Sequence, residues 1–380
     1  MEFQRGLIPM KRFTLATFLF VLSVSISCGT SKPSSTAAAV RSYNGTASVG
    51  DFLTISVDST NHTIQYVNHT NGDSGTVSYT VNVDGTYTVT DPQGNLLAAY
   101  EVPGFVLLVE TAKSGPTHNT PALITAIESV PTSISNLANQ NFNYMQWRTS
   151  SGGLEIGTVS IDTLGDIQHD SFRPSGVLQQ VPNYFGGGTF PASSIVEDPS
   201  GNFFTIHETQ GNSDDVVFGT QNGLWAVDGG GGAILGLPKT ATKAFDPTTA
   251  GTYTAIYYEK ANAQAGPNNT ETGTPSQGRG TLTVGANASV ALTDSLGTRL
   301  ATGTLVAVAD SSYIYDGTSN TLSDPCNGMF TARVTAANGD RQDFFVSFQG
   351  KAALFASFQT AVPVVTQPAT YTYFYGVGLK

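Results

Sequence analysis

Hydrophobic and polar residues alternate along most of this chain in short runs. In residues 51–57, 76–83 and 343–348, apolar side chains fall at every second position. Alternate residues of a strand face opposite sides of a sheet, so this pattern predicts half-buried β-strands. Clusters of Gly, Asn, Asp and Pro separate the runs and predict hairpin turns. No long segment has the periodicity of an amphipathic helix.

One turn, together with the strand after it, occurs three times. Residues 91–101 and 198–208 match nearly position for position, and residues 324–334 are a looser copy. In such a turn Asp accepts backbone hydrogen bonds, Pro fixes φ, and Gly adopts a positive φ. Two further hairpins repeat in the same order: residues 89–98 resemble 292–301, and residues 215–227 resemble 343–356. The repeats predict an all-β fold of tandem, related antiparallel modules, each an up-and-down β-barrel or a two-sheet sandwich.

Breaks in the strand pattern predict the boundaries of three modules, at residues 42–138, 139–240 and 245–380. Residues 122–127 are expected to close the first module as its last strand. Residues 261–280 are rich in Asn, Thr, Gly and Pro. Their length and polarity predict a mobile or binding loop.

The N-terminus has the features of an export signal. Basic residues precede an apolar run at residues 13–26, which is short for a membrane-spanning helix and typical of a signal peptide. The run ends in Ser25-Ile26-Ser27-Cys28-Gly29, which resembles the lipobox of bacterial lipoproteins, although Ser25 stands where that family usually has Leu. The resemblance implies that Cys28 is diacylated and becomes the mature N-terminus.

This resemblance covers only the first 28 residues. It implies a signal peptide at residues 1–27 and a protein anchored by lipid in the bacterial cell envelope, in the outer membrane or at the cell surface. Residues 28–41 are rich in Ser, Ala and Thr and predict a flexible tether. An ordinary secretory signal, cut at residues 37–39, is the alternative.

Composition and motifs narrow the class of function. The net charge is −11, and Lys and Arg do not cluster beyond the N-terminus, which argues against a nucleic-acid partner. The sequence has no zinc or calcium motif and no nucleophile elbow, so no metal, cofactor or catalytic residue is predicted. Cys326 is expected to be a small residue of the third turn. A nucleophilic thiol and a disulfide with Cys28 are the alternatives.

Two glutamates stand at the end of the repeated strand. Glu101 and Glu208 share the parity of apolar residues such as Leu97 and Phe204, which predicts that they face the core. A core-facing carboxylate has a raised pKa and can act as an acid or bind a ligand. The alternative is that each glutamate lies at a strand end already in water.

Aromatic residues supply the remaining candidates for ligand binding. Tyr371, Tyr373 and Tyr375 alternate along the last strand, and Trp147 and Trp225 lie in equivalent-looking strands of the second module. Exposed rings can stack on sugars or on a partner protein. Cross-strand packing inside a barrel produces the same pattern.

These features together predict an envelope lipoprotein with a non-catalytic binding or interaction role. A glycan, an apolar small molecule and an envelope protein are the candidate ligands. The first alternative is a hydrolase of an envelope or extracellular polymer that uses Glu101 or Glu208 as its acid. The second is a transmembrane β-barrel, which the alternating strands fit and the lipobox disfavours.

Overall fold

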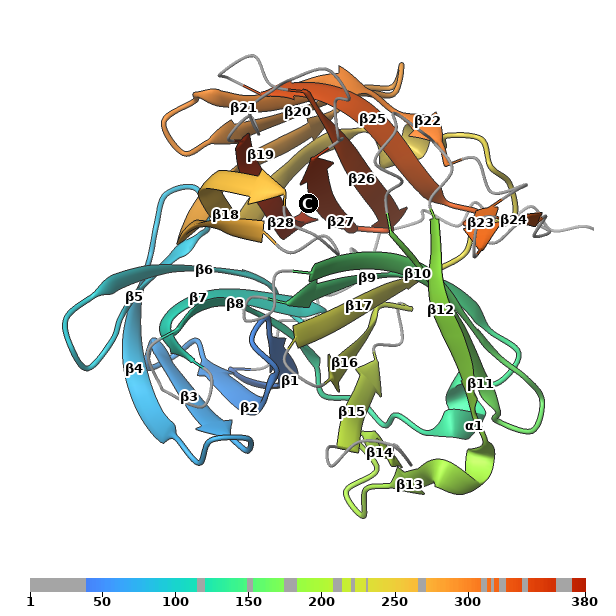
Figure 1. The fold of residues 1–380 in the computed structure, drawn as a ribbon. Helices are drawn as coiled ribbons and strands as arrows, with labels where there is room; N and C mark the ends of the chain where they lie inside the picture. Colours follow the sequence, from blue (N-terminus) through green and yellow to red (C-terminus); the bar gives the residue numbers. More distant parts are fainter. Residues whose placement is uncertain are drawn as a thin grey trace, which may run out of the picture. The chain divides into compact units, whose positions relative to one another are not determined.

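The computed structural model describes most of the chain beyond residue 38. The described residues are 39–114, 120–148, 153–173, 183–207, 214–219, 223–229, 232–265, 271–308, 313–315, 318–320, 326–336, 341–359 and 371–380. The signal peptide and Cys28 lie outside them. Most described elements are β-strands, which confirms the all-β prediction (Figure 1). No helix in the described part has the length and apolar character needed to span a membrane.

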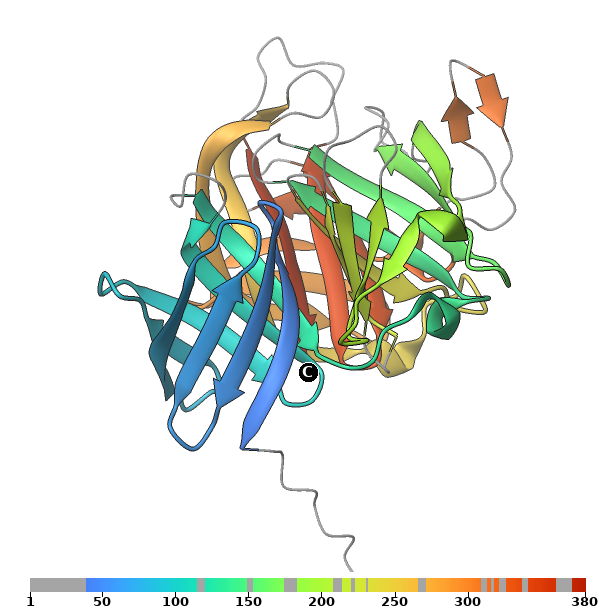
Figure 2. The ribbon, with the colours of Figure 1, turned by 90° about the horizontal axis from the view of Figure 1, so that it is seen from below.

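The first eight strands form a closed antiparallel barrel, barrel 1 (Figure 2). Each strand pairs with the next, and the first pairs with the last, so that Tyr43 lies opposite Glu128. This ladder confirms that residues 122–127 close the first module. The strands are β1 (Val40–Ala47), β2 (Asp51–Asp58), β3 (Thr63–Asn68), β4 (Ser74–Val81), β5 (Tyr87–Thr90), β6 (Leu96–Val102), β7 (Val106–Ser114) and β8 (Thr120–Glu128).

The second sheet curls into an incomplete barrel, barrel 2. Its order is β13-β14-β15-β16-β17-β9-β10-β11-β12, and no ladder joins β12 to β13 among the described strands. Phe190 of β12 and Ile195 of β13 nevertheless pack against the same apolar cluster. The strands are β9 (Asn141–Arg148), β10 (Gly153–Ile161), β11 (Ile167–Arg173), β12 (Asn183–Phe190), β13 (Ile195–Glu197), β14 (Phe204–His207), β15 (Asp214–Gly219), β16 (Trp225–Gly229) and β17 (Gly232–Pro238).

The third sheet also forms a ring, barrel 3. Its first strand pairs with its last, and a short ladder between β21 and β25 closes the ring. The strands are β18 (Gly251–Ala265), β19 (Glu271–Val284), β20 (Ser289–Asp294), β21 (Arg299–Thr304), β22 (Val306–Ala307), β25 (Met329–Ala336), β26 (Arg341–Gln349), β27 (Ala352–Gln359) and β28 (Tyr371–Leu379). The remaining hairpin, β23 (Tyr313–Tyr315) and β24 (Thr318–Asn320), joins the second sheet through a parallel contact of Ile314 with Asn183.

The prediction of a loop at residues 261–280 is wrong for residues 261–265 and 271–280, which are strands; residues 266–270 lie outside the described part. Strand β18 continues to Ala265, strand β19 begins at Glu271, and their backbones pair in this region, with Ala261 opposite Thr274. These segments are mostly polar, so apolar and polar residues do not alternate along them. Strand prediction depends on that alternation, whereas in the structure backbone pairing defines the strands.

The repeated turns have the expected geometry. The Asp91 carboxylate accepts a hydrogen bond from the backbone N of Gln93 (2.9 Å), and the Asp198 carboxylate accepts one from Ser200 (2.8 Å). The glycines that end these turns have φ values of 83° and 72°. The turn at residues 294–298 has the same backbone hydrogen bonds as that at residues 91–95, which confirms one predicted hairpin repeat. The third Asp-Pro turn begins outside the described residues.

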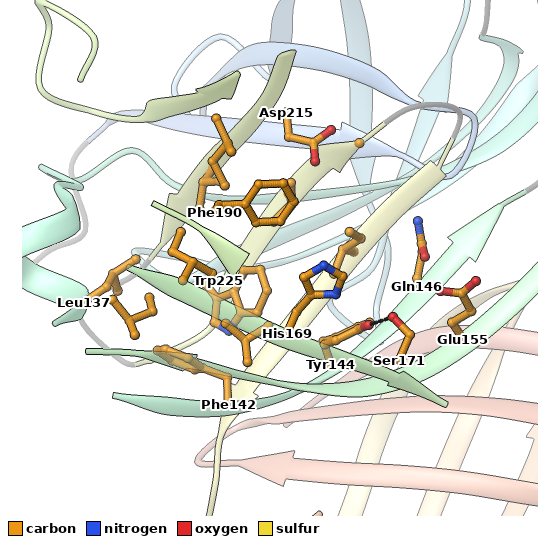
Figure 3. Close-up of a pocket in the computed structure, with 18 of the residues that line it drawn as sticks. Leu137, Phe142, Tyr144, Gln146, Glu155, His169, Ser171, Phe190, Asp215 and Trp225 are labelled. Atoms are coloured by element: carbon orange, nitrogen blue, oxygen red, sulfur yellow. Dashed lines mark hydrogen bonds between the residues drawn. The ribbon is translucent and has the colours of Figure 1, made fainter. Parts of the chain in front are cut away.

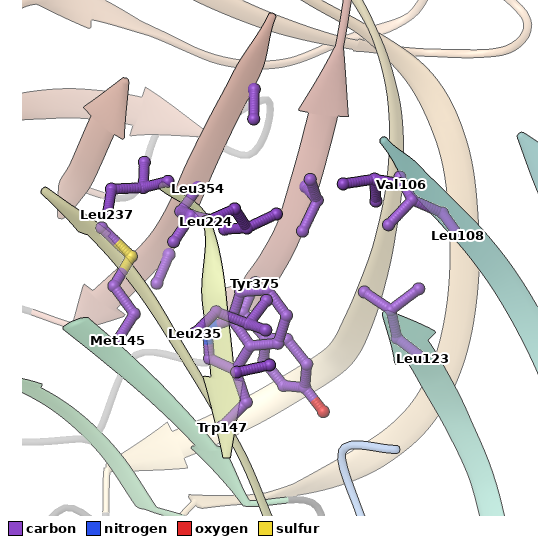
Figure 4. Packing of buried hydrophobic residues seen from close by; sticks show 14 of the residues in the cluster. Val106, Leu108, Leu123, Met145, Trp147, Leu224, Leu235, Leu237, Leu354 and Tyr375 are labelled. Carbon is purple, nitrogen blue, oxygen red and sulfur yellow. The ribbon is translucent and has the colours of Figure 1, made fainter. Parts of the chain in front are cut away.

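Four apolar clusters hold the described part together. One lies inside each barrel, and the fourth lies between the three sheets (Figure 4). The fourth cluster joins Leu108 of barrel 1, Leu235 of barrel 2 and Leu354 of barrel 3. Strands such as β9 and β27 are therefore buried on both faces, and the described residues belong to one compact unit.

Candidate ligand-binding cavity

Barrel 2 encloses a cavity of about 510 Å³ (Figure 3). This volume lies within the usual range of small-molecule sites. Inward-facing residues of β9, β10, β11 and β14–β16 form most of its wall, and Leu137 of the short helix α1 (Ile134–Leu137) adds to it. The apolar lining includes Phe142, Val159, Ile161, Ile167, Phe204, Ile206, Val217, Trp225 and Val227.

Glycines opposite aromatic rings shape the wall of this cavity. Trp225 lies opposite Gly236 and Tyr144 lies opposite Gly157 in the strand register. A Cβ atom added at Gly236 would lie 2.1 Å from the Trp225 ring, and one at Gly157 would lie 2.3 Å from the Tyr144 ring. Glycine is therefore required for both rings to lie against the neighbouring strand.

Most polar groups of the cavity lie on one side, and Asp215 of β15 lies apart from them (Figure 3). The hydroxyls of Tyr144 and Ser171 share a hydrogen bond of 2.5 Å. Gln146 and Glu155 lie opposite each other on β9 and β10, and both are buried. In Figure 3, Gln146, Glu155 and Ser171 gather on one side, while Leu137, Phe142 and Trp225 lie on the other.

His169 stands between the two sides and stacks on Phe190, with 5.4 Å between ring centroids and an angle of 15°. The cavity therefore has an apolar part and a polar part. This arrangement suits a molecule with an apolar body and one polar end.

The two tryptophans face opposite sides of barrel 2. Trp225 lines the cavity and packs edge-on against Phe142 at 5.5 Å. Trp147 is fully buried between the sheets, where its ring stacks on Tyr375 at 4.8 Å. Tyr375 also stacks on Tyr258 at 4.8 Å.

For Tyr375, cross-strand packing explains the aromatic pattern better than an exposed binding surface. Tyr371 and Tyr373 belong to β28, opposite Ala263 and Lys260. The structure describes the backbones of these two residues and not their side chains.

Glu101 faces the interior of barrel 1, as its parity predicts, so the alternative of a strand end in water is wrong. Its side chain is fully buried and accepts hydrogen bonds from Arg41 Nε (2.6 Å) and Nη2 (2.7 Å). Tyr87 donates a further bond of 2.7 Å, and Tyr43 donates another.

Burial is the main cause that raises the pKa of both tyrosines well above the ordinary value. The charge of Glu101 and the hydrogen bonds to it raise the pKa further, so both tyrosines remain donors. This geometry is typical of a structural ion pair. Glu208 lies outside the described residues.

Cys326 is buried in the cluster between the sheets, three residues before the start of β25. Its packing agrees with a structural role, and its relation to Cys28 lies outside the described residues. In the described part, no group of three or more His, Cys, Asp or Glu side chains is arranged to hold a metal ion.

The sequence interpretation missed the polar residues of the cavity. Tyr144 and Gln146 have the same parity on β9, and Ile167, His169 and Ser171 have the same parity on β11. Polar residues at inward positions of β9 and β11, the two strands that flank β10, were the available signal. Without the register between the strands, that signal does not indicate a common site.

No protein-family model and no curated protein matches this sequence. Among solved structures, the chain is similar to intact Ap-TbpB with its N and C lobes, at 11% identity, 91% coverage of this chain, 79% coverage of that chain and a TM-score of 0.27. It is also similar to a mutant of Transferrin Binding Protein B from Haemophilus parasuis, at 10% identity, 87% and 66% coverage and a TM-score of 0.26. Scores this low assign neither a fold family nor a function.

Proposed function

We propose that this chain is a lipid-anchored envelope protein that binds an apolar small molecule in barrel 2 without transforming it. The observation that carries this proposal is the cavity of about 510 Å³ with its aromatic and aliphatic wall. Burial of roughly 300 Å² of apolar ligand surface would contribute about 7 kcal/mol before the costs of association. The expected affinity is therefore modest, and the polar side of the cavity orients the ligand.

The hydrolase alternative receives less support. Both carboxylate oxygens of Glu101 accept hydrogen bonds from Arg41 and from a tyrosine inside barrel 1. A general acid needs access to the bond that it protonates, and the Glu101 side chain is fully buried. The burial of Trp147 and Tyr375 likewise gives less support to a glycan than to an apolar ligand.

The outer surface of barrel 1 supports a barrel that lies in water. On β4, Thr76, Ser78 and Thr80 are exposed, whereas Val77 and Tyr79 pack inside the barrel. Transmembrane barrels have the reverse pattern, with an apolar band outside. This contrast favours the anchored binding protein over the transmembrane barrel.

A fluorescence titration with the apolar dye N-phenyl-1-naphthylamine tests the binding site. Val159 points into the cavity, and Ser160 is the next residue on the same strand and faces the other way. Val159→Trp should raise the Kd at this site roughly tenfold or more, equivalent to about 1.4 kcal/mol. Ser160→Trp is the matched control. Equal dye binding by the wild type and a folded Val159→Trp variant would overturn the proposal.

The lipid anchor has its own test. Cells that express the full chain and are fed an alkyne-labelled fatty acid should label the wild type and not Cys28→Ala. Labelling of the Cys28→Ala variant at the wild-type level would exclude Cys28 as the lipidated residue, and would leave the cavity proposal intact.

A further inference from the structure

Barrel 1 is closed at one end by the ion pair already described. Arg41 lies level with Val57 in the register, and Glu101 lies level with Leu107. Tyr79 and Tyr87 stack beside them with 4.4 Å between ring centroids. Charged and aromatic side chains therefore occupy the interior at this end.

The rest of the interior is hollow. It holds a cavity of about 540 Å³, similar in volume to the cavity of barrel 2. The apolar wall comes from seven of the eight strands and consists of Leu53, Ile55, Ile64, Val77, Val89, Leu97, Val109 and Ile124. An antiparallel barrel of eight strands is wide enough to hold one small ligand.

Polar residues mark the mouth of this cavity at the ends of strands. Asn68 ends β3, Asp73 precedes β4, and Asp91 follows β5. The Asn68 amide donates to the Asp51 carboxylate at 2.8 Å, and the Asp91 carboxylate accepts from the backbone N of Asn95 at 2.7 Å. Hydrogen bonds within the barrel thus fix the mouth before any ligand arrives, which lowers the cost of binding.

The charges along the cavity indicate which polar end group a ligand of this cavity would have. The charged residues among its described lining are all carboxylates: Asp73, Asp91 and Glu110. Glu110 has the parity of Leu108, which faces away from the interior, so Asp73 and Asp91 are the carboxylates at the mouth, where a further negative charge would be costly. A neutral or positively charged end group therefore fits, whereas a fatty-acid carboxylate would be repelled.

We propose that barrel 1 is a second binding site, for an apolar molecule whose neutral or cationic end lies at the mouth near Asn68, Asp73 and Asp91. The site is separate from the cavity of barrel 2 and has its own lining residues. The two sites can therefore be removed one at a time.

Dye titration of single variants tests this site. Val77 faces the cavity, and Ser78 is exposed on the other face of the same strand. Wild-type protein should bind two molecules of N-phenyl-1-naphthylamine per chain. Val77→Trp should lose one of them through a roughly tenfold or larger rise in Kd, while Ser78→Trp keeps both. Val159→Trp should lose the other molecule.

The outcomes separate the two proposals. If a folded Val77→Trp variant keeps wild-type stoichiometry, the site in barrel 1 is wrong, whatever Val159→Trp does. If only Val77→Trp loses dye, the site in barrel 1 stands and the site in barrel 2 fails. Circular dichroism reports folding. Should Val77→Trp unfold, Leu97→Trp replaces it, with the adjacent Leu96→Trp as control, because Leu97 lines the cavity and Leu96 is 72% exposed.

Competition identifies the class of ligand. Dodecylamine should displace the dye from the Val159→Trp variant at a concentration at least about tenfold lower than laurate, because the two have equal chains and opposite charges. Equal or better displacement by laurate would overturn the assignment of a neutral or cationic end.

Discussion

Barrels 2 and 3 share a topology in which the first strand pairs with the last, yet their interiors differ. In barrel 3, rings from different strands contact one another, with 5.7 Å between the centroids of Phe344 and Phe355 and 6.2 Å between those of Tyr257 and Phe374. In barrel 2, the rings of Phe142, Tyr144, Phe204 and Trp225 line a cavity. An inward-facing aromatic ring therefore does not by itself decide whether a barrel is filled.

Closure of the ring is one part of this difference. A ladder of β21 with β25, with Ala301 opposite Ala336, closes barrel 3. In barrel 2, a short turn at Ala192–Ser194 takes the place of a ladder between β12 and β13. Barrel 1 is closed as well, but its ion pair fills only one end. Whether a barrel is filled or hollow therefore depends both on closure of its ring and on the volume of its inward-facing side chains.

The largest expected effect concerns the filled end of barrel 1. Arg41→Ala leaves the buried Glu101 carboxylate without its cation and should lower the free energy of unfolding by about 3–5 kcal/mol. Chemical denaturation measures this loss. A double variant, Arg41→Met with Glu101→Leu, should recover most of it. A loss below about 1 kcal/mol for Arg41→Ala would show that this end is not held by the ion pair.

Truncation of matched aromatic residues compares barrels 2 and 3 directly. Phe355 and Phe204 are both fully buried, but only Phe204 borders a cavity. Phe355→Ala should cost about 4 kcal/mol, whereas Phe204→Ala should cost about 2 kcal/mol because it removes fewer contacts. Urea unfolding of both variants measures the difference. Equal costs would mean that barrel 2 is as tightly packed as barrel 3.

Glycine substitutions test whether the rings have room to move. A Cβ atom at Gly278 would lie 2.1 Å from the Tyr257 ring, just as one at Gly236 would lie 2.1 Å from the Trp225 ring. The Trp225 ring can turn into the cavity, so Gly236→Ala should cost about 1 kcal/mol and Gly278→Ala about 3 kcal/mol. The reverse order, measured by thermal unfolding, would contradict a hollow barrel 2.

The smallest effect concerns the face of β16 that points away from the cavity. Burial, with help from the nearby Asp51 and Asp215 charges, raises the pKa of Asp228 to about 7, although Thr46 donates a hydrogen bond of 3.2 Å to it. The folded state then binds a proton that the unfolded state has lost, so stability falls as the pH rises from about 4 to about 7.

Between pH 5 and pH 8, the wild type should therefore lose about 2–3 kcal/mol more stability than Asp228→Asn. Thermal unfolding at both pH values measures this. Parallel pH profiles would show that Asp228 is not the buried acid.

The sequence predicts the strands and turns because hydrogen bonding and side-chain parity are local properties. The parity that placed Glu101 inside a barrel is one example, and the repeated turn at residues 91–95 is another. The separate environments of Trp147 and Trp225 were not predictable from parity, because apolar clusters cover both faces of barrel 2. The cavity of barrel 2 depends on which strands pair and in what register, and pairing between strands far apart in the sequence leaves no local signal.

The most direct test of a hollow barrel that holds a ligand is native mass spectrometry of residues 38–380, exported and purified from the source organism without detergent. The same sample is measured again after denaturation. A hollow barrel predicts extra mass in the native spectrum that disappears on denaturation, or one or two adducts when N-phenyl-1-naphthylamine is added. Identical native and denatured masses, with no adduct at saturating dye, would contradict a binding role for either cavity.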